Sequence, residues 1–443
     1  MNTLLHDLQG LTVITDPSTV TKLSQDYHTF SPILHPLLDQ KRADMVVIPT
    51  NEEQVLQAAQ ACVRHRIPLT VRGAGTGNYG QCVPLHGGVV LDMSQMQTIR
   101  WIQPGRVRVE AGARLAAIDK QARDMGWELR MVPSTYRTAT IGGFIGGGSG
   151  GIGSINYGQL RDRGNLHGVR VVTLEDTPRI LELRGDDVQQ VNHAYGTNGI
   201  MVELEVPLAP AIPWVELIVV FNDFPTAAHF GQSLGDADGL VKKLITILAD
   251  PIPVYLTALR DFFPAGSHGA LVMVAEFSLE SFQELVRQWE GKITYQKSTG
   301  ETNKGVSLVE YTWNHTTLHA RSADASITYL QTIFPKDEEL KLLLQLYDHF
   351  GNEVMMHLEF IRVGGAVVPA ALQLVRFQTP ERLLDIIEYH EKRGAFIANP
   401  HTYLLEDGGR KEIEPEQLQF KQKVDPYGLL NPGKMRSWNQ TEG

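Results

Sequence analysis

The chain has 443 residues, 42% apolar and 20% charged, which is ordinary for a globular protein and long enough for two or three domains. Its formal net charge of −10, from 40 Lys and Arg against 50 Asp and Glu, disfavours nucleic acid and anionic lipid as partners. It has no apolar run of ~18 residues, and Cys62 and Cys82 form no CxxC pair, which argues against a transmembrane helix, a disulfide framework and a thiolate metal centre.

The first residues bear on where the protein resides. Residues 1–7 contain neither a basic region nor an apolar core, so we expect no signal peptide. Two cysteines in so long a chain suit a reducing compartment. We therefore expect a cytoplasmic protein and leave peripheral attachment to a membrane open.

The clearest local unit covers residues 44–71. Residues 45–48, Met-Val-Val-Ile, predict a short buried strand, and residues 69–71, Leu-Thr-Val, predict a second one. Between them, Thr50 with Glu53 three residues later predicts a capping box that opens a helix ending near His65. A strand, a helix and a strand this close together predict a βαβ unit with parallel strands.

A second α/β segment follows and ends at a proline-bearing hinge over residues 207–213. Its predicted helix has an apolar face at Leu115, Ile118, Ala122 and Met125 and stops at Gly126. The predicted strands around it cover residues 89–91, 106–109, 169–172, 180–183 and 202–206.

Beyond the hinge, strand-like and helix-like segments alternate. We predict strands over 215–221, 270–277 and 293–296, and helices over 227–234, 280–289, 336–350 and from Pro380, with Thr379 as its cap, to Gly394. This order suggests an antiparallel sheet covered by helices, that is, an α+β cap domain.

A glycine-rich stretch, Arg-Gly-Ala-Gly-Thr-Gly-Asn-Tyr-Gly over residues 72–80, directly follows the predicted strand 69–71. Such a loop lets backbone N–H groups surround a diphosphate. A flexible surface turn is the plain alternative. A Rossmann loop is rejected because residues 81–88 lead into another strand instead of a helix, and a Walker A loop because no Lys-Ser or Lys-Thr follows.

The flavin alternative is favoured by further segments in the same order. Residues 133–158 hold Pro-Ser-Thr, Ala-Thr-Ile-Gly-Gly and Asn-Tyr-Gly, residues 195–200 read Tyr-Gly-Thr-Asn-Gly-Ile, and residues 424–435 read Val-Asp-Pro-Tyr-Gly-Leu-Leu-Asn-Pro-Gly-Lys-Met. Together with the loop at 72–80, these segments resemble the FAD-linked oxidases of the vanillyl-alcohol oxidase/p-cresol methylhydroxylase (PCMH) superfamily, closest to the branch of glycolate oxidase FAD subunits and D-lactate dehydrogenases.

The resemblance implies an α+β fold: a PCMH-type FAD-binding domain of two α/β subdomains over residues 1–211, an α+β cap over 212–400, and a segment over 401–443 that returns to the FAD domain. It implies FAD as the cofactor, held without a covalent bond because Thr76 stands where covalent relatives carry histidine. The residues that it places at FAD are Arg72, Gly73, Ala74, Gly75, Thr76, Gly77, Asn78, Pro133, Ser134, Thr135, Thr138, Ala139, Thr140, Gly142, Gly143, Gly150, Gly151, Tyr157, Gly158, Gly196, Gly199, Ile200, Asn431 and Lys434.

The resemblance also implies that the flavin ring lies where the FAD domain meets the cap. Oxidation of a hydroxy acid there needs a base for the hydroxyl proton and an arginine for the carboxylate. His315 is the first candidate base, and Arg321 and Arg362 are candidate clamps. The other candidate catalytic residues are His401 and Tyr403. In each case the alternative is an ordinary structural role.

One departure concerns a metal. Many members of this branch carry His-x-x-Gly-Asp-Gly-Asn-x-His, and this chain has no such stretch around residues 355–359. His357 and Glu359 would share a face of a strand, but two ligands do not make a site. We therefore expect no metal.

The expected activity is FAD-dependent dehydrogenation of a small alcohol or 2-hydroxy acid, such as glycolate or D-lactate, by hydride transfer to flavin N5. Two alternatives stay open: a sugar or aldonolactone oxidase of the same fold, and a flavin-binding subunit that relays electrons within a larger oxidase complex. The expected partners are a small-molecule substrate and an electron-acceptor protein or quinone, with a homodimer or an oxidase complex as the assembly.

Overall fold

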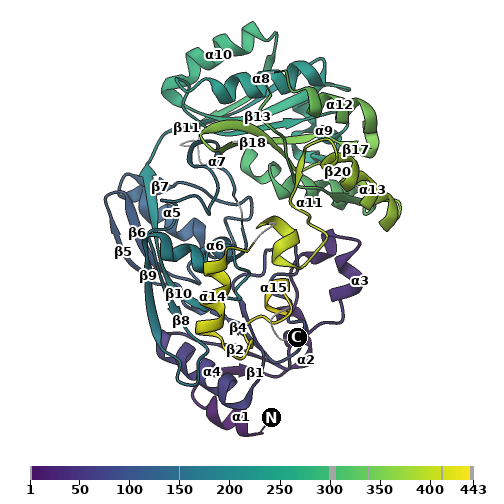
Figure 1. The fold of residues 1–443 in the computed structure, drawn as a ribbon. Helices are drawn as coiled ribbons and strands as arrows, with labels where there is room; N and C mark the ends of the chain where they lie inside the picture. Colours follow the sequence, from purple (N-terminus) through teal and green to yellow (C-terminus); the bar gives the residue numbers. More distant parts are fainter. Residues whose placement is uncertain (1, 149, 299–305, 338, 411–412, 440–443) are drawn as a thin grey trace.

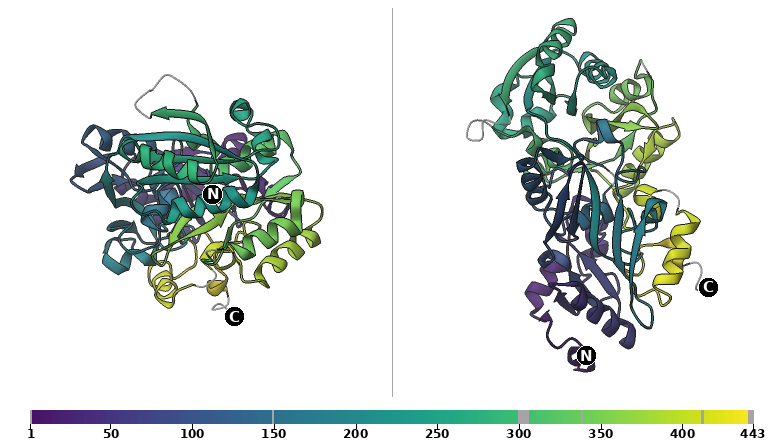
Figure 2. Two further views of the ribbon diagram at one scale, coloured as in Figure 1. Left: turned by 90° about the horizontal axis from the view of Figure 1, so that it is seen from above. Right: turned by 90° about the vertical axis from the view of Figure 1, so that its left-hand side faces the viewer.

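The computed structural model describes residues 2–148, 150–298, 306–337, 339–410 and 413–439. The molecule is elongated and has two halves (Figure 1). The half that contains the N-terminus holds two sheets, and the other half holds a large sheet with helices on its outer side. The C-terminal helices α14 (Pro415–Val424) and α15 (Arg436–Asn439) lie beside the N-terminal half in both Figure 1 and Figure 2.

The first sheet has the order β1 (Thr12–Ile14), β2 (Met45–Ile48), β4 (Val89–Asp92), β3 (Leu69–Arg72). Strands β2 and β3 both run parallel to β4, so the predicted parallel βαβ unit is confirmed, with β4 inserted between its strands. The predicted helix is α4 (Glu52–His65). The predicted cap was wrong: Asn51 accepts the Gln54 N–H at 3.0 Å, and Thr50 lies one residue outside.

The second sheet is antiparallel and has the order β5 (Ile99–Gln103), β6 (Arg106–Glu110), β10 (Ile200–Pro210), β8 (Gly168–Val172), β9 (Ile180–Arg184), with β7 (Trp127–Leu129) paired to β10. The helices of this part are α5 (Leu115–Asp124) and the short α6 (Ile141–Gly147) and α7 (Ser154–Tyr157). The sequence predicted α5 but not α6, because the glycines of α6 have a low helix propensity.

The third sheet has the order β14 (Lys292–Ser298), β11 (Trp214–Phe221), β13 (His268–Ala275), β12 (Lys242–Leu248), β18 (His357–Val363), β19 (Ala366–Ala371), β16 (Thr332–Ile333), β21 (Phe396–Ile397). All its pairings are antiparallel, as predicted for the cap. The fold is therefore α+β. The strand β12 at its centre was not among the predicted elements.

Helices α8 (Phe224–Asp236), α10 (Leu279–Gln288), α12 (Lys341–Phe350) and α13 (Pro380–Glu391) share one apolar core with the third sheet. Helix α12 begins five residues after its predicted start at Lys336. Thr379 caps α13 as predicted and accepts the Arg382 N–H at 3.1 Å. On the other face, α9 (Ile252–Tyr255) and α11 (Asn314–Ala323) pack against the sheet. A small sheet of β15 (Ile327–Tyr329), β20 (Leu374–Arg376) and β17 (Val354–Met355) completes this half.

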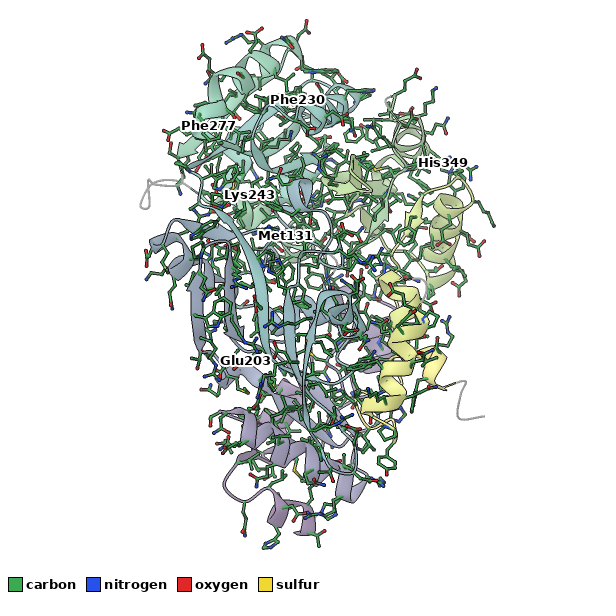
Figure 3. The ribbon with its side chains drawn as sticks, turned by 60° about the vertical axis from the view of Figure 1, so that its left-hand side comes forward. Met131, Glu203, Phe230, Lys243, Phe277 and His349 are labelled. Atoms are coloured by element: carbon green, nitrogen blue, oxygen red, sulfur yellow. The ribbon has the colours of Figure 1, made fainter. Side chains whose placement is uncertain are left out.

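The two halves meet over buried polar and apolar contacts. Lys243, on β12, and Met131, after β7, lie in this contact zone, whereas Phe230 lies among the outer helices (Figure 3). Lys243 Nζ donates to Glu128 Oε1 across the zone at 2.7 Å. The tail returns to the first sheet, where Leu69 N–H donates to Leu429 O and Asn431 N–H donates to Leu69 O, both at 2.8 Å. We propose that the domain boundaries lie at residues 211 and 400.

Candidate active site

A cavity of about 390 Å³ lies between the two halves. Its wall on the N-terminal half comes from the loop after β3, from residues 133–161 and from residues 193–201. Its wall on the cap comes from the start of α11, from the strands β16, β18 and β19, and from residues 396–398. The segments singled out in the sequence are therefore brought together in space.

The glycine loop is shaped by its own arginine. Arg72 is buried, and its guanidinium donates to Gln25 O at 2.5 Å and to Ala74 O at 3.4 Å. Gly75 has φ +66°, and a Cβ there would lie 2.0 Å from Arg72 Nη2. Arg72 thus braces the loop, and Gly75 is needed for the loop to turn around it.

The second segment packs backbone against backbone. A Cβ on Gly142 would lie 2.8 Å from Ala111 Cβ and 2.9 Å from Ala111 O, so a side chain does not fit there. Thr140 caps α6 by accepting the Gly143 N–H at 3.2 Å, and a Cβ on Gly73 would meet Thr140 Oγ1 at 2.2 Å. The first two segments are therefore in direct contact.

The third segment lies against the end of α6. His193 N–H donates to Ile145 O at 3.0 Å and Tyr195 N–H donates to Gly146 O at 2.8 Å. Both residues have φ near +50°, a conformation that costs ~1–3 kcal/mol and that the surrounding contacts must enforce.

The tail fixes the loops from outside the cavity. Asn431 Nδ2 donates to Gln81 O at 2.8 Å and to Tyr195 O at 2.6 Å, and Lys434 Nζ donates to Gly80 O at 2.6 Å. Complete burial lowers the pKa of Lys434 to about 7. Neither residue lines the cavity, so both support the glycine loop and the third segment.

Most residues expected at FAD line the cavity: Arg72, Gly73, Ala74, Gly75, Thr76, Gly77, Asn78, Pro133, Ser134, Thr135, Thr138, Ala139, Thr140, Gly142, Gly143, Gly150, Gly196 and Gly199. Six others stand outside the lining, namely Gly151, Tyr157, Gly158, Ile200, Asn431 and Lys434. For Gly151 the reason is local, because a Cβ there would lie 2.3 Å from Val132 O.

The cavity fits a dinucleotide that carries phosphates. No Asp or Glu occurs among the described residues of its lining, although the chain as a whole has a net charge of −10. Glycines of two segments lie along its wall on the N-terminal half, and Cβ atoms at Gly73, Gly75 and Gly142 would collide with neighbouring protein atoms. The lining itself therefore places no carboxylate against an anion.

The cap contributes His315, which lines the cavity from the first turn of α11. His315 Nδ1 lies 3.4 Å from Glu310 Oε2, and Arg137 Nε lies 2.6 Å from Glu310 Oε1. The hydrogen bond from His315, followed by the charge of Arg137, lowers the pKa of Glu310. The imidazole is thus oriented by an anion, with Nε2 on the far side of the ring.

A buried network holds the start of α11. Glu359 accepts the Trp313 N–H at 2.7 Å, the Thr246 hydroxyl at 2.7 Å and the His357 Nε2 at 3.1 Å. His357 and Glu359 share a face of β18, as expected, and are at most 1% exposed. Trp313 lines the cavity with φ +52° and ψ −138°, a strained conformation that the Glu359 contact helps to maintain.

The other four candidate catalytic residues lie outside the cavity lining, and each has other partners. Arg321 donates to the carbonyls of residues 29, 30 and 327, and Arg362 donates to Ile155 O, Gly365 O and Asp238. His401 hydrogen-bonds Ser31 Oγ at 2.8 Å and Tyr329 O at 2.9 Å, and Tyr403 packs with Leu34, Leu38 and Val83.

Two residues of the site were missed. Glu310 was overlooked because its contact with His315 depends on how the 3₁₀ turn at 308–311 leads into α11. Arg161 lines the cavity and was overlooked because one arginine in a polar turn resembles a surface residue. The only signal for Arg161 was its position three residues after the Asn-Tyr-Gly of the second segment.

The described residues lack the features of two other classes of site. They contain no group of three or more His, Cys, Asp or Glu side chains arranged to hold a metal ion. Among the helices that the structure describes, none has both the length and the apolar character needed to cross a membrane.

Comparison with known families identifies the N-terminal half. Residues 43–181 match the family described as FAD binding domain. Glycolate oxidase subunit GlcD of Escherichia coli K12 is 29% identical over 232 residues, covering 50% of this chain and 45% of that protein. GlcD of Bacillus subtilis is 24% identical over 431 residues, covering 89% of each.

Solved structures match the whole fold. An alkyldihydroxyacetonephosphate synthase superposes with a TM-score of 0.74 at 16% identity, covering 98% of this chain and 85% of that one. The 4-ethylphenol oxidase from Gulosibacter chungangensis superposes with a TM-score of 0.71 at 15% identity, covering 98% and 96%. The chain therefore has the fold of the PCMH-type FAD-binding oxidases, and FAD is its cofactor.

Proposed function

We propose that this chain, whose residues 43–181 form an FAD binding domain, is an oxidoreductase that dehydrogenates a small alcohol or 2-hydroxy acid. One observation carries the proposal: a histidine oriented by a carboxylate lines the same cavity as the glycine segments of the FAD domain. The names of the GlcD relatives support a glycolate-like substrate.

The proposed chemistry divides between cofactor and protein. Bound FAD supplies a two-electron acceptor at N5 for the hydride that leaves the substrate carbon. His315 Nε2 takes the proton of the substrate hydroxyl, so that a carbonyl product forms. Glu310 holds the opposite nitrogen and stabilises the positive charge that the ring gains, and Arg137 keeps Glu310 in place. Trp313 and Leu318 shield the reacting atoms from water on the cap side.

We propose that the flavin is held without a covalent bond. Thr76 cannot form a histidyl link, and burial raises the pKa of Cys82, which lines the cavity, to about 11, so that its thiol is a poor nucleophile. Acid precipitation of the purified protein should release all of the yellow cofactor into the supernatant. Flavin that stays in the pellet would show a covalent link.

The proposed base is tested by anaerobic flavin reduction in stopped flow with glycolate, D-lactate and a panel of sugars. His315→Gln should slow reduction by roughly 10²–10⁴-fold. His319→Gln is the matched control, because His319 lies on the same helix but bonds Glu310 O at 3.0 Å and is not part of the lining. Equal rates for both variants would remove His315 from the reaction, and bleaching by sugars alone would favour the sugar oxidase alternative.

The electron acceptor is also part of the proposal. The relatives with the name GlcD are described as subunits, which supports an assembly with a second polypeptide and reoxidation by a protein or quinone. Reoxidation of the reduced protein should then be faster with a quinone analogue than with oxygen. Faster reoxidation by oxygen would indicate an oxidase.

A further inference from the structure

Arg161 differs from the other arginine of the cavity lining in having no partner. The Arg72 guanidinium donates hydrogen bonds to the carbonyls of Gln25 and Ala74. Arg161 lines the same cavity and is only partly exposed, yet its side chain forms no hydrogen bond or ion pair with any residue that the structure describes. Its donors are therefore available to an anion that enters the cavity from outside.

The turn that carries Arg161 is fixed on both sides of it. Leu160 is buried in the core of the N-terminal half, and its carbonyl accepts from Asn192 Nδ2 at 3.1 Å. Asp162 accepts the Gln159 N–H at 2.9 Å, and Asn165 Nδ2 donates to Gln159 O at 2.8 Å. The neighbouring carboxylate is thus committed to the backbone and leaves Arg161 unpaired.

A glycine makes this turn possible. Gly158 has φ +73°, and a Cβ there would lie 2.2 Å from Asp162 Oδ2. Because Asp162 closes the turn through Gln159, a side chain at residue 158 would open it and move Arg161. The backbone that carries Arg161 is therefore held in place before any ligand binds.

The turn belongs to the part of the N-terminal half that contacts the cap. Just before it, Asn156 Nδ2 donates to Lys242 O at 2.6 Å, and Arg362 Nε donates to Ile155 O at 3.1 Å. The loop braced by Arg72 instead contacts residues 25–27, where Tyr27 N–H donates to Gly77 O at 2.8 Å. The two arginines therefore serve different ends of the cavity, one at the glycine loop and one at the cap.

We infer that Arg161 is the residue that binds the carboxylate of the substrate and makes the enzyme select an anionic alcohol over a neutral one. This inference rests on the proposed function. Its forked donors match a carboxylate in two parallel hydrogen bonds. With no acidic side chain among the described residues of the lining, the charge of Arg161 is not cancelled locally. It takes the role first expected of Arg321 and Arg362.

The test compares Arg161→Gln with Arg163→Gln in the FAD-loaded protein. Arg163 is two residues away in the same turn, but it is exposed and paired with Asp186, and it does not line the cavity. Binding of oxalate, an unreactive dicarboxylate, is measured by calorimetry, so that this readout needs no turnover. Arg161→Gln should weaken oxalate binding by roughly 30-fold or more, and Arg163→Gln should leave it within about 2-fold.

A kinetic measurement tests whether the substrate is an anionic alcohol. The ratio of kcat/KM for glycolate to that for ethylene glycol should fall by roughly 30-fold or more in Arg161→Gln and should recover in part in Arg161→Lys. Unchanged oxalate binding or an unchanged ratio would overturn the inference. So would loss of FAD from Arg161→Gln, because the guanidinium would then serve a cofactor phosphate.

The two proposals fail in different ways. If no alcohol reduces the flavin of the unaltered protein, the proposed function is wrong, while the oxalate titrations still decide whether Arg161 is an anion site. If glycolate reduces the flavin of Arg161→Gln as fast and with the same KM, the proposed function stands and Arg161 is not the clamp.

Discussion

The two walls of the cavity are made of different material. The wall on the N-terminal half includes many glycines from three segments, which Arg72 braces within the lining and Asn431 and Lys434 hold from outside it. The wall on the cap consists of side chains on α11 and on three strands of one sheet. A wall of backbone suits a cofactor that stays the same, and a wall of side chains can change with the substrate.

Changing the glycine-rich wall should have the largest effect on cofactor binding. In Gly142→Val the new side chain would collide with Ala111, whose backbone cannot withdraw, and the overpacking should cost ~1–3 kcal/mol and displace the second segment. We expect nearly complete loss of bound flavin, measured as the ratio of flavin to protein absorbance. Gly239→Val is the control, because nothing lies within 4 Å of a Cβ there. Full flavin content in Gly142→Val would contradict the role given to this segment.

The cap wall should depend on charge and hydrogen bonds. Glu359→Leu removes the acceptor of the Trp313 N–H and leaves His357 without its carboxylate partner, which should lower the free energy of unfolding by about 3–5 kcal/mol. Glu359→Gln keeps an oxygen for Trp313 and should lose less. Urea denaturation measures the free energy of unfolding of both variants. Slow flavin reduction in Glu359→Gln would show that the reaction needs the charge of Glu359 and not only its shape. Equal stability of the two variants would refute the network.

A weaker effect is expected where the tail meets the cap and the N-terminal segment, and it depends on pH. Burial lowers the pKa of His401 to about 4, against 6.5 for an unburied histidine, and the hydrogen bond to Tyr329 O opposes this shift only in part. A folded-state pKa below the unfolded one means that this stabilisation is full above pH 6.5 and is lost as the pH falls through 4. The free-energy gap between wild type and His401→Gln should shrink by up to about 3 kcal/mol between pH 7 and pH 4. A constant gap would contradict the assignment.

The smallest effect is expected at the exposed ion pair beside Arg161. Arg163 and Asp186 form an ion pair in which the side chains are 77% and 74% exposed, so Arg163→Gln should change the free energy of unfolding by less than about 0.5 kcal/mol. Thermal denaturation at low and high salt measures this change. A large, salt-dependent loss would mean that the turn of Arg161 is held by charge and not by Asp162 and Asn165.

The contrast between the two walls of the cavity also explains which features could be predicted from the sequence. The FAD segments were recognisable because each is a local run of glycines and small residues. A positive φ or a close approach requires glycine at one position, so it is visible in the local sequence. The βαβ unit was predictable for the same reason, although β4 could not be placed between its strands from local patterns. Asn51 was passed over as a cap because Thr50 with Glu53 fits a capping box equally well.

The cap wall could not be read in this way, because its residues meet only through the fold. Arg321 and Arg362 were chosen for their residue type, and no local pattern shows that carbonyls of residues 30 and 155 occupy them. His315 was chosen because residues 311–321 supply a histidine and an arginine close together, but its contact with Glu310 needed the structure. Arg161 became visible only as a guanidinium without a partner.

The most direct test of the account is a titration of apoprotein with FAD, followed by anaerobic addition of a hydroxy acid. We predict that the purified protein is yellow, that apoprotein takes up one FAD per chain, and that Gly142→Val fails to do so while Gly239→Val succeeds. We further predict that a hydroxy acid bleaches the bound flavin. A colourless protein that takes up no FAD would contradict the central claim that this cavity holds a flavin.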